Sequence, residues 1–188
     1  MSSYNRRDWF TIPNILSYIR ILLVPVFIFI YLNATETKHF QYAALIVVFS
    51  GLTDLLDGWI ARKYNQITEI GKLLDPIADK ITQAAIIFCL IFRYDYMWLL
   101  VLLFVVKELT MGICNVVLFK KGKKLDGAKW FGKISTAVFY GCMTGLVAFP
   151  MISDGTATLL MSVTGFFLFL SFILYAKVFT EMLRSVKK

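Results

Sequence analysis

The chain has 188 residues, of which 59% are hydrophobic, 16% aromatic and only 17% charged, and its formal net charge is +8. A soluble domain of this length needs polar residues over most of its surface, so the composition excludes a soluble globular protein and predicts a membrane protein. The basic residues lie between apolar runs rather than on a solvated face, which excludes nucleic acid as a partner and favours anionic membrane lipids.

Six apolar segments follow one another along the chain, each near the ~20 residues that cross a bilayer. They cover residues 15–32, 41–60, 76–92, 97–119, 134–151 and 156–180. The alternating pattern of a barrel strand is absent from the sequence, so the spans are expected to be helices. We therefore predict a single all-α domain over residues 1–188. It is an integral membrane bundle of six transmembrane helices with a short N-terminal interfacial segment that includes Trp9 and Phe10.

The connectors between these segments differ in their content of Lys and Arg. The N-terminus, the second and fourth connectors and the C-terminal tail contain fourteen such residues, whereas the other three connectors contain only Lys38 and Arg93. Cytoplasmic segments of membrane proteins are enriched in Lys and Arg. We expect a multi-pass protein of the cell membrane, with both termini and the second connector on the cytoplasmic side.

Four of the twelve acidic residues lie in and around the second connector: Asp54, Asp57, Asp75 and Asp79. The first two are three residues apart and therefore share a helix face, which Gly58 and Ala61 extend with small side chains. After a loop that contains Gly71, Asp75 is expected to cap a helix that begins at Pro76. Two helix ends would then present two pairs of carboxylates to each other.

Converging carboxylates near a bilayer repel one another and are costly to bury, and one or two divalent cations remove both problems. An all-oxygen ligand set suits Mg²⁺ or Mn²⁺ rather than zinc. In a purely structural alternative, the aspartates cap helices and pair with Arg62, Lys72 and Lys80, but this leaves the spacing of Asp54 and Asp57 unexplained. Metal beside small residues and an arginine is typical of a site for a phosphate-rich ligand.

The motif D-x-x-D-G-x-x-A-R-x₈-G-x-x-x-D-x-x-x-D is complete over residues 54–79. This pattern resembles the signature of the CDP-alcohol phosphotransferase family, and the stretch IPNILSYIRILLVPVF at residues 12–27 is similar to the N-terminal segment of members that make glycerol phospholipids. The resemblance implies a CDP-diacylglycerol-dependent phosphatidyltransferase that releases CMP. Its six-span layout with a cytoplasmic site also matches.

The resemblance assigns roles to individual residues. It implies metal binding by Asp54, Asp57, Asp75 and Asp79, with Asp79 also the catalytic general base. It implies contacts with the CDP group by Asp54, Asp57, Gly58, Ala61, Arg62, Gly71 and Asp75. The residues that we expect at the acceptor are Arg20, Lys107, Glu108, Lys133 and Ser135.

The acceptor alcohol is less clearly indicated. Family members that use glycerol 3-phosphate resemble one another in R-E-x₆-R and G-K-x-K-T, where this chain has KELTMGICN and GKIST. Asn115 and Ser135 stand where cations are expected, and a phosphodiester needs fewer cations than a phosphate monoester. The sequence therefore favours phosphatidylglycerol as acceptor and cardiolipin as product, with glycerol 3-phosphate, which gives phosphatidylglycerophosphate, as the alternative.

Three other classes of protein fit the sequence less well. A cation carrier would have acidic residues distributed through several spans, whereas the four aspartates here cluster at one end of the predicted bundle. A non-catalytic bundle that binds partners gives the aspartates no reason for their spacing, and a prenyl-diphosphate enzyme would show a D-D-x-x-D run.

Gly141 and Gly145 have the spacing of close helix contact, which would serve packing within the chain or a homodimer.

Overall fold

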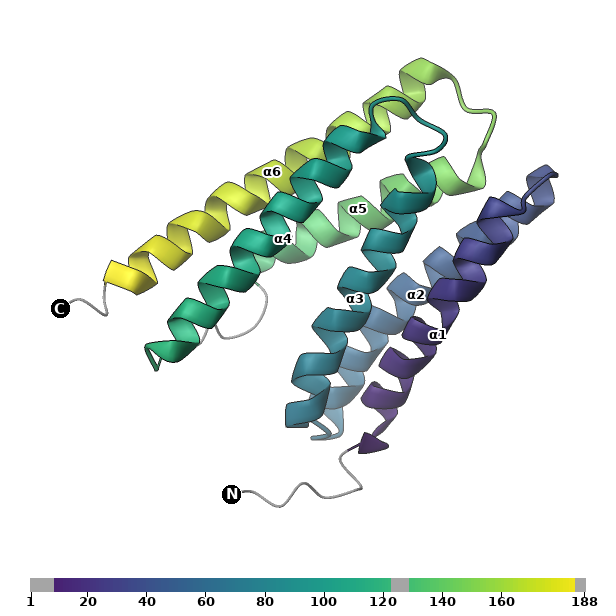
Figure 1. The fold of residues 1–188 in the computed structure, drawn as a ribbon. Helices are drawn as coiled ribbons and strands as arrows, with labels where there is room; N and C mark the ends of the chain where they lie inside the picture. The colour runs from purple at the N-terminus through teal and green to yellow at the C-terminus, as the bar shows by residue number, and fades with distance from the viewer. Residues whose placement is uncertain (1–8, 123–128, 185–188) are drawn as a thin grey trace. The chain divides into compact units, whose positions relative to one another are not determined.

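The structure is a computed structural model, and it describes residues 9–122 and 129–184 (Figure 1). These residues form six helices, which confirms the all-α prediction: α1 Ile12–Leu32, α2 Thr37–Lys63, α3 Glu69–Leu90, α4 Met97–Lys120, α5 Trp130–Ala148 and α6 Asp154–Arg184. The part of the predicted interfacial segment before Trp9 lies outside the described residues. Trp9 and Phe10 themselves are exposed.

Within the described ranges, five helices are long and apolar enough to cross a bilayer, and they are all of the helices except α3. The chain is therefore a multi-pass membrane protein. Helix α3 differs because every stretch of 18 residues within it contains Asp75, Asp79 and Lys80. The predicted third span, residues 76–92, thus itself contains Asp79 and Lys80, and the uncharged part of α3 begins only at Ile81.

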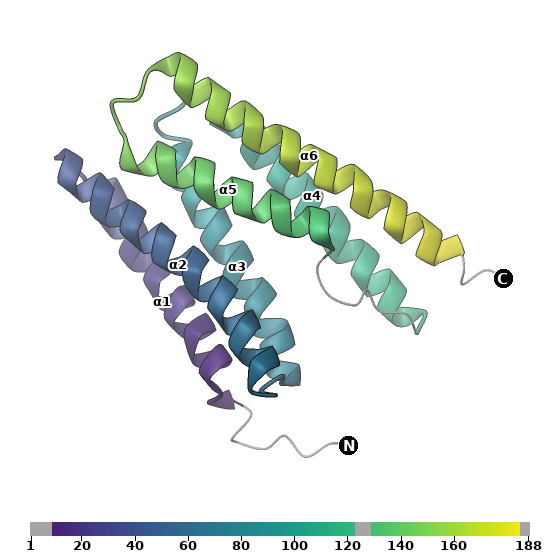
Figure 2. The same cartoon turned by 180° about the vertical axis from the view of Figure 1, so that it is seen from behind.

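The chain divides into two compact units. The first comprises Met1–Arg93 with Thr144–Met151, and the second comprises Tyr94–Met143 with Ile152–Lys188. In the first unit, α1 packs along both α2 and α3, as both views show (Figures 1 and 2). Short connectors make these three helices run alternately up and down. The expectation of a single domain over residues 1–188 stays a prediction.

Helix α3 begins seven residues earlier than the sequence analysis expected. Its N-cap is Thr68, whose Oγ1 accepts a hydrogen bond of 2.9 Å from the backbone N–H of Gly71. Gly71 thus lies in the first turn of α3 rather than in a loop, and Asp75 is not a cap. A threonine cap is a strong helix start, and the helix continues through Pro76 although proline removes one backbone hydrogen bond.

The junction between α1 and α3 is held by polar side chains. Asn14 Nδ2 donates a hydrogen bond of 3.2 Å to Thr68 Oγ1, and Asn14 is almost fully buried. A Cβ added at Gly71 would lie 2.6 Å from Asn14 Oδ1 and 3.0 Å from Thr68 Oγ1. Only glycine lets α1 approach the first turn of α3 so closely.

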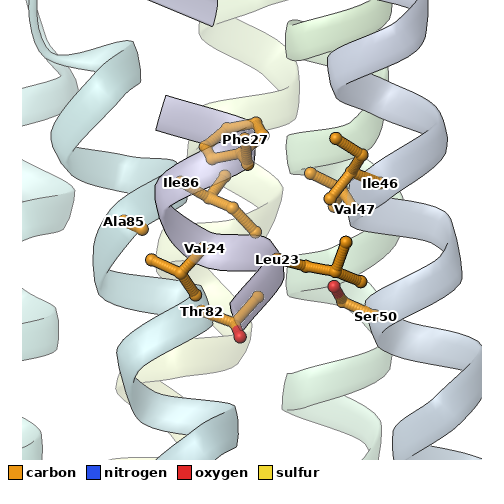
Figure 3. Close-up of a pocket in the computed structure, with 9 residues that line it drawn as sticks. All are labelled: Leu23, Val24, Phe27, Ile46, Val47, Ser50, Thr82, Ala85 and Ile86. Carbon is orange, nitrogen blue, oxygen red and sulfur yellow. The ribbon is translucent and has the colours of Figure 1, made fainter. Parts of the chain in front are cut away.

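An apolar layer fills the space among α1, α2 and α3 (Figure 3). Three residues from each helix line a small pocket there, and all are apolar except Ser50 of α2 and Thr82 of α3. The Thr82 hydroxyl donates to the carbonyl of Ala78 at 2.9 Å, so its polar group is satisfied within its own helix. This layer lies one helical turn beyond Arg20 on α1, at Leu23.

In the second unit, α4 packs along α6. The Tyr175 ring of α6 lies 4.7 Å from the ring of Phe131 on α5, centroid to centroid, and its hydroxyl accepts a hydrogen bond of 3.2 Å from the Lys129 backbone N–H. A Cβ at Gly141 would meet no atom within 4 Å in the described part of the chain outside its own helix. Close packing at this glycine is therefore not observed, and a homodimer stays a prediction.

Replacing Gly71 with alanine should destabilise the protein, because the new methyl group would displace the buried Asn14 side chain. We expect a loss of about 1–3 kcal/mol, the usual cost of overpacking. The measurement is the thermal unfolding midpoint of the purified protein in detergent. The matched control is Gly112→Ala in α4, where the added Cβ meets nothing within 4 Å. Equal midpoints for the two variants would contradict the close approach.

Candidate functional site

Three carboxylates converge from two helices of the first unit. Asp54 and Asp57 come from α2 and Asp75 from α3, and each offers an oxygen within 4.8 Å of those of the other two. The i, i+3 spacing directs the first two to one face of α2, and the short α2–α3 connector brings α3 back beside that face. The structure thus brings together three of the four aspartates that the motif singled out.

A fully buried arginine of α1 lies among these carboxylates. Arg20 Nη1 is 2.6 Å from Asp54 Oδ1 and 3.4 Å from Asp75 Oδ1, and Nη2 forms an ion pair with Asp57 Oδ2. The sequence analysis placed Arg20 at the acceptor and did not foresee these ion pairs. One feature of the sequence does point to these ion pairs. Arg20 is a single arginine inside an apolar span, and such an arginine needs a partner in the bundle.

Asp79 lies one turn beyond Asp75 on α3 and belongs to a second polar group. Both of its carboxylate oxygens accept from Gln83 Nε2 at 3.0 Å, and Oδ2 lies 3.3 Å from Lys80 Nζ. The sequence analysis missed Gln83, although a buried glutamine one turn after an aspartate is a recognisable orienting partner. The purely structural alternative paired the aspartates with Arg62, Lys72 and Lys80. Among the described residues, only the pair between Asp79 and Lys80 is present.

The remaining motif residues lie along the same region of α2. Gly58 and Ala61 are half-buried, and Arg62 is exposed. The Arg62 guanidinium folds back toward Gly58, since a Cβ at Gly58 would lie 3.9 Å from Arg62 Nη2. The positively charged Arg62 side chain therefore lies beside the small residues of α2, and it is close in sequence to the carboxylates.

The three carboxylates of Asp54, Asp57 and Asp75 suit a divalent cation that takes oxygen ligands. Asp57 Oδ1 is buried and has no hydrogen-bond partner among the described residues, although a buried carboxylate oxygen is costly to leave unsatisfied. Arg20 contacts Asp54 Oδ1, Asp57 Oδ2 and Asp75 Oδ1, and none of these is the unpartnered oxygen of Asp57. An all-oxygen set of this kind is the chemistry that Mg²⁺ and Mn²⁺ prefer.

The single histidine has a structural position. His39 lies in the first turn of α2, where it forms a capping box with Glu36. Asp54 lies fifteen residues further along the same helix, so His39 is at the opposite end of α2 from the carboxylates.

The other residues expected at the acceptor belong to the second unit. Lys107 of α4 is buried and its Nζ lies 3.0 Å from Glu108 Oε1. On α5, Lys133 is exposed and Ser135 is buried. The Ser135 hydroxyl has no hydrogen-bond partner in the described part of the protein.

Known proteins are similar to this chain in sequence. Residues 10–180 match the model of the CDP-alcohol phosphatidyltransferase family. The chain is 31% identical over 147 residues to the CDP-diacylglycerol–glycerol-3-phosphate 3-phosphatidyltransferase of Escherichia coli (strain K12), which covers 76% of this chain and 80% of that protein. Proteins of the same description from Shigella flexneri serotype 5b and Shigella sonnei match with the same identity and coverage.

The family match covers nearly the whole chain, including all six helices except the end of α6, and it contains the complete aspartate motif. Family membership also accounts for the convergence of Asp54, Asp57 and Asp75, whose oxygen ligands are consistent with the metal binding of this family. The chain therefore belongs to the CDP-alcohol phosphatidyltransferase family, and it is a membrane enzyme that acts on a CDP-alcohol.

Proposed function

We propose that the protein transfers the phosphatidyl group of CDP-diacylglycerol to glycerol 3-phosphate, with release of CMP, in a reaction that depends on Mg²⁺ or Mn²⁺. The observation that supports the metal-dependent chemistry is the convergence of three carboxylates, of which Asp57 is buried and Asp54 and Asp75 are partly exposed. The relatives named above support glycerol 3-phosphate, because they are described as glycerol-3-phosphate 3-phosphatidyltransferases. The proposal thus adopts the acceptor that the sequence analysis ranked second.

Phosphatidylglycerol remains the second candidate acceptor, and a specific observation favours it. Asn115 and Ser135 stand where the sequence pattern of glycerol 3-phosphate users has cations. Under the first proposal, Lys107 and Lys133 supply the positive charge that a phosphate monoester needs. Glu108 holds Lys107 in place through their contact of 3.0 Å.

The CDP group is proposed to bind along the site-facing side of α2 and the start of α3. Asp54, Asp57 and Asp75 hold one or two divalent ions. The small side chains of Gly58 and Ala61 leave room for the diphosphate, and the Arg62 guanidinium, which lies beside Gly58, clamps a phosphate oxygen. Gly71 has a packing role against Asn14, so its contribution to CDP binding is to permit the α1–α3 junction.

Asp79 is proposed as the general base, and it joins the metal site when the ions are bound. Its carboxylate takes the proton of the acceptor hydroxyl, whose oxygen attacks the β-phosphorus of the CDP-lipid. The bond between that phosphorus and the bridging oxygen breaks, and CMP leaves with the bonding electrons. The amide of Gln83 donates to both Asp79 oxygens at 3.0 Å and keeps the carboxylate oriented. The metal, when bound, stabilises negative charge on the diphosphate and the leaving oxygen.

The enzyme is proposed to work at the cytoplasmic face of the cell membrane. The basic residues at both termini and in the second and fourth connectors support this orientation. The carboxylates lie toward the end of the first unit that contains the α2–α3 connector, which is the same end as the start of α1 (Figure 1). Water-soluble glycerol 3-phosphate and departing CMP would then exchange with the cytoplasm.

The acceptor is decided by a direct assay of the purified protein. It is given CDP-diacylglycerol with either glycerol 3-phosphate or phosphatidylglycerol, and CMP release is followed with Mg²⁺, with Mn²⁺ and with EDTA. We expect CMP with glycerol 3-phosphate, little with phosphatidylglycerol and none with EDTA. Release with phosphatidylglycerol alone would replace the first acceptor by the second. Undiminished release in EDTA would contradict the metal role.

Asp79→Asn should bind the metal and CDP-diacylglycerol but turn over about 10²–10⁴-fold more slowly, because an amide cannot take the acceptor proton. Single-turnover CMP release and equilibrium binding of CDP-diacylglycerol separate the two effects. Asp95→Asn, the same chemical change in the exposed α3–α4 connector, is the matched control. Normal turnover by the Asp79 variant would remove the base assignment.

Arg62→Ala should weaken CDP-diacylglycerol binding about 10- to 100-fold, because it removes a charge-assisted hydrogen bond to phosphate. The neighbouring Lys63 is the matched control, since its Nζ lies 4.3 Å from the centroid of the Trp59 ring and so has a different contact. Binding is measured by titration of the detergent-solubilised protein. If Arg62→Ala and Lys63→Ala bind the lipid equally well, the clamp role is wrong.

A further inference from the structure

We propose that Arg20 is a positioning residue of the metal site: it fixes one oxygen of Asp54, Asp57 and Asp75 so that their other oxygens face the cation. This role differs from the acceptor contact expected from the sequence. It rests on the proposed metal-dependent function, and it concerns how a residue of α1 organises ligands that belong to α2 and α3.

The contacts of Arg20 give this arrangement directly. Nη1 is 2.6 Å from Asp54 Oδ1 and 3.4 Å from Asp75 Oδ1, while Nη2 pairs with Asp57 Oδ2. One planar group thus touches three carboxylates on two helices. Guanidinium is suited to this because its donors form a rigid fork and it stays charged at any physiological pH.

The oxygens that Arg20 does not contact are the ones a cation would use. Asp57 Oδ1 is the clearest case, because it is buried and has no hydrogen-bond partner among the described residues. Arg20 holds Oδ2 of the same carboxylate, so the direction of Oδ1 is set by the ion pair. Metal-binding carboxylates are commonly oriented in this way by an outer hydrogen bond.

The charges of the cluster also agree with this role. Three ionised carboxylates carry −3, and the guanidinium reduces the sum to −2, which one divalent cation neutralises. Without Arg20 the three acids would repel one another without a compensating charge. Arg20 therefore holds the three carboxylates together in the metal-free protein. It stays in contact with them when the ion is bound.

An acceptor role for Arg20 fits the structure less well. Its side chain is 0% exposed, and both terminal nitrogens already contact carboxylates. A substrate phosphate would have to displace an aspartate to reach it. On the next turn of α1, Leu23 and Val24 line a mostly apolar pocket among the three helices (Figure 3).

The experiment measures Mn²⁺ affinity of the purified full-length protein, by electron paramagnetic resonance titration without lipid substrate. We expect Arg20→Gln to raise the Mn²⁺ Kd about 10- to 100-fold, the usual effect of losing an outer partner of a metal ligand. Arg20→Lys keeps the charge but lacks the fork, so we expect it to recover only part of the affinity. Arg93→Gln is the matched control, because Arg93 donates to the Pro150 carbonyl at 2.7 Å in the same unit. Its Kd should equal that of the wild type.

A second readout is the thermal unfolding midpoint in EDTA and in Mn²⁺. The Mn²⁺-induced rise in the midpoint should be smaller in both Arg20 variants than in the wild type, whereas a merely structural role would lower both midpoints equally. An unchanged or tighter Kd in Arg20→Gln overturns the inference. If Arg20→Gln does not fold, wild-type affinity in Arg20→Lys overturns it. A wild-type protein that binds no Mn²⁺ overturns the proposed metal-dependent function itself, and the inference with it.

Discussion

The ion pairs between Arg20 and three aspartates are the interaction on which the rest of the site depends. A fully buried guanidinium and three partly buried carboxylates are each costly to place beside a bilayer, and they become tolerable only together. Removing one member of such a group costs about 3–5 kcal/mol, because the others are left without a partner. The cluster therefore ties α1, α2 and α3 together at the level of the three aspartates.

The packing of the first unit follows from this constraint. On one side of the charged cluster, apolar side chains from the same three helices line the interior, and on the other side, toward the start of α1, Asn14 and Thr68 join α1 to the first turn of α3. Gly71 permits this contact because no side chain separates the helices there. Rigid helices fixed at two levels hold the carboxylates in place, which is the condition for binding a metal and a diphosphate in one geometry.

Much of this could be predicted from the sequence because membrane physics restricts the choices. The long apolar segments predicted the number of helices, and the spacing of Asp54 and Asp57 indicated that they share a helix face. The start of α3 was predicted wrongly, because Pro76 is a stronger signal in sequence than the Thr68 cap that prevails in the structure. The role of Arg20 was missed because ion pairs between distant segments depend on packing that periodicity does not reveal.

The central claim is that Asp54, Asp57 and Asp75 surround a divalent cation. Anomalous diffraction from crystals grown with Mn²⁺ tests it most directly, since Mn²⁺ scatters distinctly and takes the oxygen ligands of Mg²⁺. The account predicts an anomalous peak bounded by oxygens of all three aspartates, at roughly 2.0–2.3 Å. A well-ordered cluster with Mn²⁺ bound elsewhere, or with the three carboxylates turned away from one another, would contradict it.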